Sequence, residues 1–170
     1  IMDSIEAGAD ILDHGAYLDT EAAKIMVKNG IYITPTLSAY TKQTMNPKFN
    51  RGDSWATIHS VLIEPIRKAF ETALEEGVKI VCGTDSTGRY AEEVELMRVL
   101  GMGAMESLQA CTKSSAEALK LSETLGTIEL GKTADLIVLN GDPMNDPYAL
   151  EKVELVIKEG EIYYPEDIKL

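Results

Sequence analysis

This sequence of 170 residues has little of several residue types, and each shortage excludes a class of protein. It has 16 basic residues against 28 acidic ones, a formal net charge of −12, so it repels phosphate backbones and a nucleic-acid partner is not expected. No apolar run approaches the roughly 18 residues of a membrane helix, so no membrane role is expected. The two cysteines, Cys82 and Cys111, lie far apart in the sequence in contexts typical of buried positions. They do not make a disulfide framework, and they favour a reducing, cytoplasmic location.

Several catalytic motifs are also missing. The sequence has no GxSxG elbow, so serine-hydrolase chemistry has no support. It has neither a phosphate-binding loop nor a dinucleotide fingerprint. The first residue is Ile1 rather than Met, and the residues after it already have the pattern of ordered structure, so we expect the chain to be a fragment without its N-terminal part. No leader pattern is in view, which says little about the whole protein. Its hydrophobic content of 45% is that of a globular protein, which excludes wholesale disorder.

Hydrophobic patterning divides the sequence into two parts. In the first, strand-like apolar runs alternate with helical patterns, as in a parallel sheet or barrel. The second is β-rich, with a buried strand over 134–140 and a hairpin around Glu159-Gly160. The strands expected in the first part are ADILDHG, Ile31–Leu37 and Val78–Asp85, and the expected helices cover 20–29, 54–76 with a break or restart at Pro65, 91–100 and 104–119.

Three of the strand-like runs end in polar residues, namely His14, Thr36 and Asp85. In parallel α/β proteins the C-terminal ends of the strands converge on the ligand site, so these side chains are expected to lie near one another. An imidazole and a carboxylate suit zinc or a similar ion, and a metal would compensate the charge of a buried Asp85. Two alternatives remain open on pattern alone: His14 can be a satisfied core or turn residue, and Asp85 can cap the next element.

Five stretches together resemble the C-terminal half of the amidohydrolase superfamily, nearest to its imidazolonepropionase and Xaa-Pro dipeptidase-like branch. They are ILDHG, LDTEAAKIMVKNGIYITPTL, VKIVCGTDS, AMESLQACTKSSAEALKL and LGTIELGKTADLIVLNGDP. The resemblance implies an α/β fold in which residues 1–122 form the C-terminal part of a (β/α)8 TIM-like barrel. Residues 123–170 would supply strands of a small composite β-sandwich built from both chain ends. Such a half barrel exposes strand edges, so we expect a homo-oligomer or association with the missing N-terminal part.

The same resemblance implies a metal-dependent hydrolase that cleaves a C–N bond of an amide, peptide or cyclic amide with a metal-activated water. The substrate would be a small molecule or a dipeptide, and the cofactor one or two divalent metal ions, with zinc as the best match. His14 and Asp85 would be metal ligands, and Asp85 would also be the catalytic base and then acid. Thr36 and Tyr17 would contact the substrate, although plain packing is an alternative for Tyr17.

Some features of that superfamily have no counterpart here. Its HxH motif, its fourth-strand lysine and its fifth-strand histidine would precede Ile1, so the isolated chain is expected to be inactive. Asp13 stands where many relatives carry Glu. The alternative function is a non-catalytic α/β module that binds a small ligand or a partner chain. The acidic stretch AEEVE is predicted to be a solvated helix start, and Cys111 to pack in the core.

Overall fold

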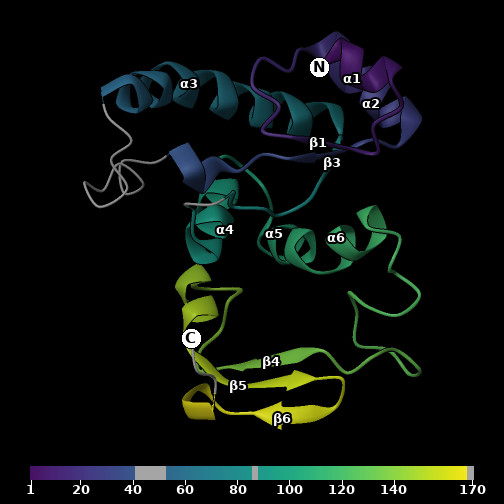
Figure 1. Cartoon of the computed structure of the whole chain (residues 1–170), viewed down its shortest axis with the longest axis vertical. Coiled ribbons are helices and arrows are strands. Elements are labelled where there is room, and N and C mark those ends of the chain that lie inside the picture. The colour runs from purple at the N-terminus through teal and green to yellow at the C-terminus, as the bar shows by residue number, and fades with distance from the viewer. Residues whose placement is uncertain (41–52, 86–87, 168–170) are drawn as a thin grey trace.

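The computed structural model of this chain describes residues 1–40, 53–85 and 88–167 (Figure 1). The strands are β1 (Ile11–Asp13), β2 (Tyr32–Thr34), β3 (Lys79–Ile80), β4 (Leu136–Leu139), β5 (Val153–Lys158) and β6 (Glu161–Tyr163). The α-helices are α1 (Met2–Glu6), α2 (Thr20–Asn29), α3 (Asp53–Glu76), α4 (Tyr90–Val99), α5 (Ala104–Cys111) and α6 (Lys113–Ala118). Short 3-10 helices are η1 (Leu37–Tyr40), η3 (Pro147–Glu151) and η4 (Pro165–Asp167).

The strands form two separate sheets of opposite kind. The first is parallel with the order β1-β2-β3, and the second is antiparallel with the order β4-β5-β6. Helices α4, α5 and α6 lie between the two sheets along the long axis of the molecule (Figure 1). The parallel sheet with its intervening helices therefore matches the alternation of strands and helices in the first part of the sequence, and the antiparallel sheet matches the β-rich second part.

Local sequence signals explain the boundaries of α2. The Asp19 side chain accepts a hydrogen bond from the Ala22 N–H at 2.8 Å, which satisfies one of the free amides of the first turn. Gly30 ends the helix with a φ of 70°, a left-handed conformation that glycine adopts without steric cost. Ala23 and Met26 face the core and are fully buried. The predicted helix over 20–29 is confirmed.

The core lies where the helices cover the parallel sheet. Ile33 of β2 is 1% exposed and stands opposite Leu12 and Ile80 in the neighbouring strands, which are also buried. Ile66 and Phe70 of α3 pack into the same cluster. Burying one such side chain contributes about 1.5–3 kcal/mol, so this layer is the main source of stability for the first part of the chain.

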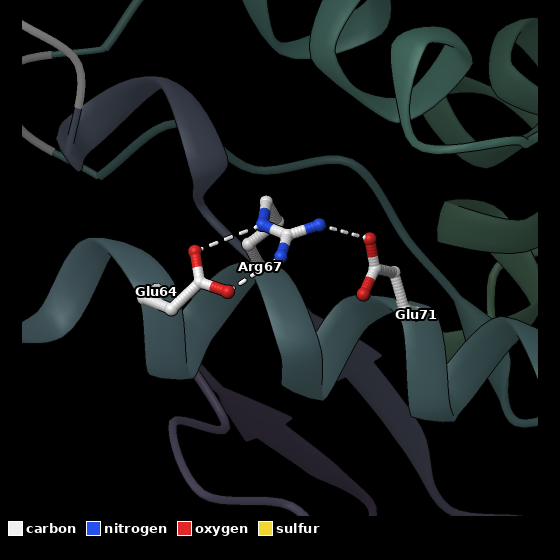
Figure 2. Close-up of polar contacts among 3 residues, drawn as sticks. All are labelled: Glu64, Arg67 and Glu71. Carbon is white, nitrogen blue, oxygen red and sulfur yellow. Dashed lines mark hydrogen bonds and ion pairs between the residues drawn. The ribbon is translucent and has the colours of Figure 1, made fainter.

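Four predicted elements of the first part differ from the structure, and the first of them, the strand over 78–85, is only the two residues Lys79–Ile80. The strand over 31–37 ends at Thr34, because Pro35 cannot donate a ladder hydrogen bond. Helix α3 runs unbroken through Pro65, and the Arg67 guanidinium donates to Glu64 and Glu71 on either side of it (Figure 2). The single helical pattern over 104–119 is two helices that meet at Thr112, whose ψ of −87° is not helical.

The predicted hairpin around Glu159-Gly160 is confirmed: it joins β5 to β6, and β4 pairs with the other edge of β5. Glu159 and Gly160 both have positive φ, 54° and 85°, as a two-residue turn of type I′ requires. The expectation of a buried strand over 134–140 is wrong, because Ile137 and Val138 of β4 are 51% and 40% exposed. No side chain of β4, β5 or β6, all of whose residues the structure describes, is fully buried.

Side-chain contacts join the two parts of the chain. The Arg98 guanidinium on α4 donates to the carbonyl oxygens of Pro143 at 2.8 Å and Met144 at 3.2 Å. Arg89 also pairs with Glu151 of η3. The second sheet is therefore attached through η3 and the turn that precedes it, while its strands contribute little to the common core. Among the described residues, no helix is long and apolar enough to cross a membrane.

Candidate active site

The C-terminal ends of the first two parallel strands bring two predicted residues into contact. His14 follows β1, and its backbone N–H donates to the Thr34 carbonyl at 2.8 Å, which continues the pairing with β2. Thr36 lies just beyond β2, and its Oγ1 is 2.8 Å from His14 Nδ1. The tautomer with its proton on Nδ1 donates it to Thr36 and leaves a lone pair on Nε2, as a metal ligand needs. The structure thus fixes the orientation of the imidazole.

The predicted site residues have strained backbones. Among the described residues, six non-glycine residues have positive φ, and four of these are His14 (68°), Tyr17 (68°), Thr36 (51°) and Asp85 (56°). This conformation is especially unfavourable for a β-branched residue such as Thr36, and strain of this kind costs on the order of 1–3 kcal/mol at each position. Because strained residues concentrate at functional sites, their coincidence with the strand ends supports a site here.

Two glycines allow the strands to approach closely at this end of the sheet. A Cβ atom on Gly15 would lie 2.4 Å from Cδ1 of Ile33, and one on Gly83 would lie 2.4 Å from Cγ2 of Thr34. Both neighbours are side chains of β2, so a larger residue at either position would force the Ile33 or Thr34 side chain to move. The glycines that follow His14 and precede Asp85 are therefore required by packing.

Tyr40, which the sequence analysis missed, interacts with both predicted metal ligands. Its ring meets that of His14 edge to face, with 6.2 Å between the centroids. The pKa of Tyr40 is raised, first because burial disfavours the phenolate and second because the Asp85 carboxylate is close. Tyr40 therefore lies against the ring of His14 and within the electrostatic influence of Asp85. Its position in a turn, after a predicted strand, gave no signal in the sequence.

The turn that carries Thr36 rests on a buried carboxylate. Glu93 of α4 is fully buried and accepts the backbone N–H groups of Leu37 at 2.9 Å and Ser38 at 2.7 Å. Burial raises the pKa of Glu93, against the opposing effect of these amide donors. The prediction that AEEVE is solvated is wrong, because Glu92 is also buried, at 7% exposure. The stretch covers the η1 turn instead of facing water.

The other predicted residues differ widely in how far they are exposed. Asp85 is exposed, and it is not the N-cap of α4, which is Arg89, so the capping interpretation is wrong for that helix. Tyr17 is 66% exposed and lines a cavity against α3, which excludes packing in the core. Thr36 is 3% exposed and directed to His14, so a substrate contact by its side chain stays a prediction. The polar stretch Ser38–Asp53 is expected from the sequence to be a long functional loop; its first residues belong to η1, Asp53 begins α3, and residues 41–52 lie outside the described residues.

The donor set fits a divalent metal in part. His14 and Asp85 have the ligand chemistry, and the Thr36 contact orients the imidazole and is compatible with the tautomer that leaves Nε2 free for a metal. Within residues 1–40, 53–85 and 88–167, however, no group of three His, Cys, Asp or Glu side chains lies close enough to hold an ion. A catalytic zinc commonly has three protein ligands, so these two residues would need further ligands.

Known proteins resemble this chain in sequence and in fold. The amidohydrolase family profile matches residues 1–163. A crystallised Xaa-Pro dipeptidase with methionine bound in its active site is 36% identical, with a TM-score of 0.86 over 96% of this chain and 42% of its own. Ochratoxinase from Aspergillus niger is 30% identical over 86% of this chain and 31% of its own length. Imidazolonepropionase from Rhizobium rhizogenes is 29% identical over 78% and 30% respectively.

The chain belongs to the amidohydrolase family. Its strands and helices are those of an α/β fold of the TIM-barrel type, as the family and the solved relatives imply. The chain spans about a third of the length of the curated relatives and about two fifths of the dipeptidase.

Replacing Glu93 by Leu should destabilise the chain by about 2–5 kcal/mol, because it leaves two buried amide donors unpaired at about 1–3 kcal/mol each. Chemical denaturation of both proteins measures this difference. Glu92→Leu is the matched control. Within the described part of the chain, Glu92 Oε2 is buried without a hydrogen-bond partner, so its removal should be neutral or stabilising. Equal destabilisation by the two substitutions would contradict a special role for Glu93.

Proposed function

We propose that this chain is the C-terminal portion of a metal-dependent amidohydrolase that cleaves a C–N bond in an amide, a peptide or a cyclic amide. The observation that carries this proposal is the 2.8 Å contact between His14 Nδ1 and Thr36 Oγ1 at the ends of adjacent parallel strands. It holds the imidazole with Nε2 available at the edge where ligands bind in such folds. Relatives named imidazolonepropionase and Xaa-Pro dipeptidase support C–N hydrolysis.

In this proposal β1, β2 and β3 are the last three strands of a (β/α)8 barrel, and β4, β5 and β6 belong to a small β-sandwich. The parallel order β1-β2-β3 supports the first assignment, because strands that follow one another along the chain are neighbours in such a barrel. The separate antiparallel sheet with its exposed faces supports the second.

His14 and Asp85 would hold one or two divalent ions, best matched by zinc, together with ligands from the N-terminal part of the enzyme. A bound metal of this kind polarises a carbonyl and lowers the pKa of water towards about 7. Asp85 accepts a proton from the attacking water and then donates it to the leaving nitrogen. In this proposal the His14 proton is on Nδ1 and is donated to the Thr36 hydroxyl, and the Tyr40 ring meets that of His14 edge to face.

The substrate class in this proposal is a small molecule or a dipeptide. The dipeptidase that supports it has methionine in its active site and is 36% identical to this chain. Tyr17 is 66% exposed, three residues after His14 in the sequence, and in this proposal it contacts such a substrate. We place the enzyme in the cytoplasm, where its two free thiols would be reduced.

In the intact enzyme, Asp85→Asn should lower kcat by about 10²–10⁴-fold on Xaa-Pro dipeptides or cyclic amides, because the amide cannot accept a proton. Steady-state assays measure this loss. Asp13→Asn, the same change at an exposed carboxylate beside His14, serves as the control and should leave kcat near wild type. Hydrolysis unaffected by Asp85→Asn would refute the catalytic role.

Elemental mass spectrometry of the 170-residue chain, purified without chelator, should find close to zero metal per chain, because two ligands do not complete a site. The intact enzyme should carry one or two ions, and His14→Ala should reduce that content. One or two ions on the isolated chain would contradict an incomplete site. No metal in the intact enzyme would favour the alternative, a non-catalytic α/β module.

The partner of the isolated chain would be a second copy or the N-terminal part of the enzyme. Ile128 and Leu130 are 87% and 107% exposed, and Ile137 and Ile162 are each more than half exposed. A sheet without a fully buried side chain gains little stability by itself, so covering these residues is favourable. The outer edges of β1 and β3 have no strand partner among the described residues and favour association in the same way.

Size-exclusion chromatography should therefore show the isolated chain eluting ahead of a compact monomer. Ile137→Lys should shift elution towards the monomer, because it places a charge in the apolar face of β4. Val27→Lys, at a valine of similar exposure on α2, is the control and should leave the profile unchanged. A clean, stable monomer of the wild-type chain would contradict the association.

A further inference from the structure

The fold brings the two cysteines together. Cys82 follows β3, Cys111 ends α5, and the Cys82 N–H donates to the carbonyl oxygen of Ala110 at 3.0 Å. Standard peptide geometry then puts the Cα atoms of Cys82 and Cys111 within about 7 Å of each other. A disulfide spans Cα separations of about 4.4–6.8 Å, so the backbone is already close to the geometry that a bridge needs. Both thiols are free in this structure, as expected, but the prediction that Cys111 packs in the core is wrong, because Cys111 is only half-buried and lines a cavity.

The two thiols also differ in their readiness to react. The closeness of the two thiols raises the pKa of Cys82 and lowers that of Cys111, while Cys111 Sγ lies 3.4 Å from the carbonyl oxygen of Ser107. Burial raises both pKa values, and Glu93 acts in the same direction, while the Arg98 guanidinium favours the Cys111 thiolate. Because the thiolate is the nucleophile, Cys111 is the attacking group and Cys82 the group that retains its proton.

Cys111 is accessible to a small reagent. Both cysteines are half-buried, and Cys111 lines a cavity of about 600 Å³ between α6 and β4. This volume lies within the roughly 300–1,000 Å³ typical of small-molecule sites. The cavity is bordered by apolar and hydroxyl side chains, including Leu119, Ile137, Thr112 and Ser115.

We propose that Cys82 and Cys111 form a thiol pair that is oxidised to an intramolecular disulfide by low-molecular-weight disulfides such as glutathione disulfide. The Cys111 thiolate attacks one sulfur of the reagent, forms a mixed disulfide and releases one glutathione thiolate. Cys82 then loses its proton to solvent and attacks Cys111 Sγ, which releases the second glutathione thiolate. The two cysteines are oxidised together by two electrons, and one glutathione disulfide is reduced to two thiols.

The disulfide would restrain the short segment between β3 and Asp85 of the candidate site. Cys82 directly precedes Gly83-Thr84-Asp85, and a disulfide would tie this segment covalently to the end of α5. The proposal depends only on the two thiols and their surroundings, so it can be tested without any assay of hydrolysis.

The test is to incubate the reduced, folded chain with glutathione disulfide and to record its intact mass without reductant. The expected product is a monomer lighter by two hydrogens, with both thiols protected from alkylation. Cys82→Ser should stop at one glutathione adduct on Cys111. Cys111→Ser should form a glutathione adduct on Cys82 at no more than roughly one tenth of the rate at which Cys82→Ser forms its adduct on Cys111. The reason is that the Cys82 thiol is mostly protonated.

Three results would overturn the proposal. They are a folded chain that keeps two free thiols, a chain that accumulates two glutathione adducts, and a bridge that forms in urea but not in the folded state. The last result would show that the fold holds the thiols apart. A disulfide-linked dimer as the main product would equally exclude an intramolecular pair.

Discussion

The candidate site depends on the register of the central strand β2 with its two neighbours. Leu12 and Ile80 both stand beside Ile33, and the ladder continues through the bonds from His14 to Thr34 and from Val81 to Ile33. Because all three strands are parallel, their C-terminal ends lie at one edge of the sheet. A shift of one residue in either pairing would turn the side chains to the other face and separate His14 from Thr36.

Strain at that edge is offset by buried contacts beneath it. The left-handed conformations of His14 and Thr36 persist because the surrounding structure fixes them. Glu93 contributes directly, since its buried carboxylate holds two amides of the turn that follows Thr36. A charged group in this position costs desolvation energy, and the two amide hydrogen bonds compensate part of that cost.

The two sheets differ in how far the chain itself completes them. The parallel sheet has a packed core formed with α2 and α3, whereas the antiparallel sheet leaves much of its apolar surface exposed. The candidate site is likewise only partly complete. It has an oriented histidine and an accessible carboxylate, but no third metal ligand lies beside them among the described residues. Both features are explained if further protein contributes to the barrel and to the sheet.

The sequence by itself determined the elements whose signals are local. Asp19 and Gly30 bound α2, Glu159 and Gly160 form the hairpin turn, and polar residues mark the ends of the parallel strands. Only the tertiary structure decided that Glu93 is buried under η1 and that Tyr40 lies beside His14. It also decided that Cys82 meets the end of α5. These contacts join residues far apart in the chain, and no propensity or periodicity in a single segment reports which distant backbone will pack against it.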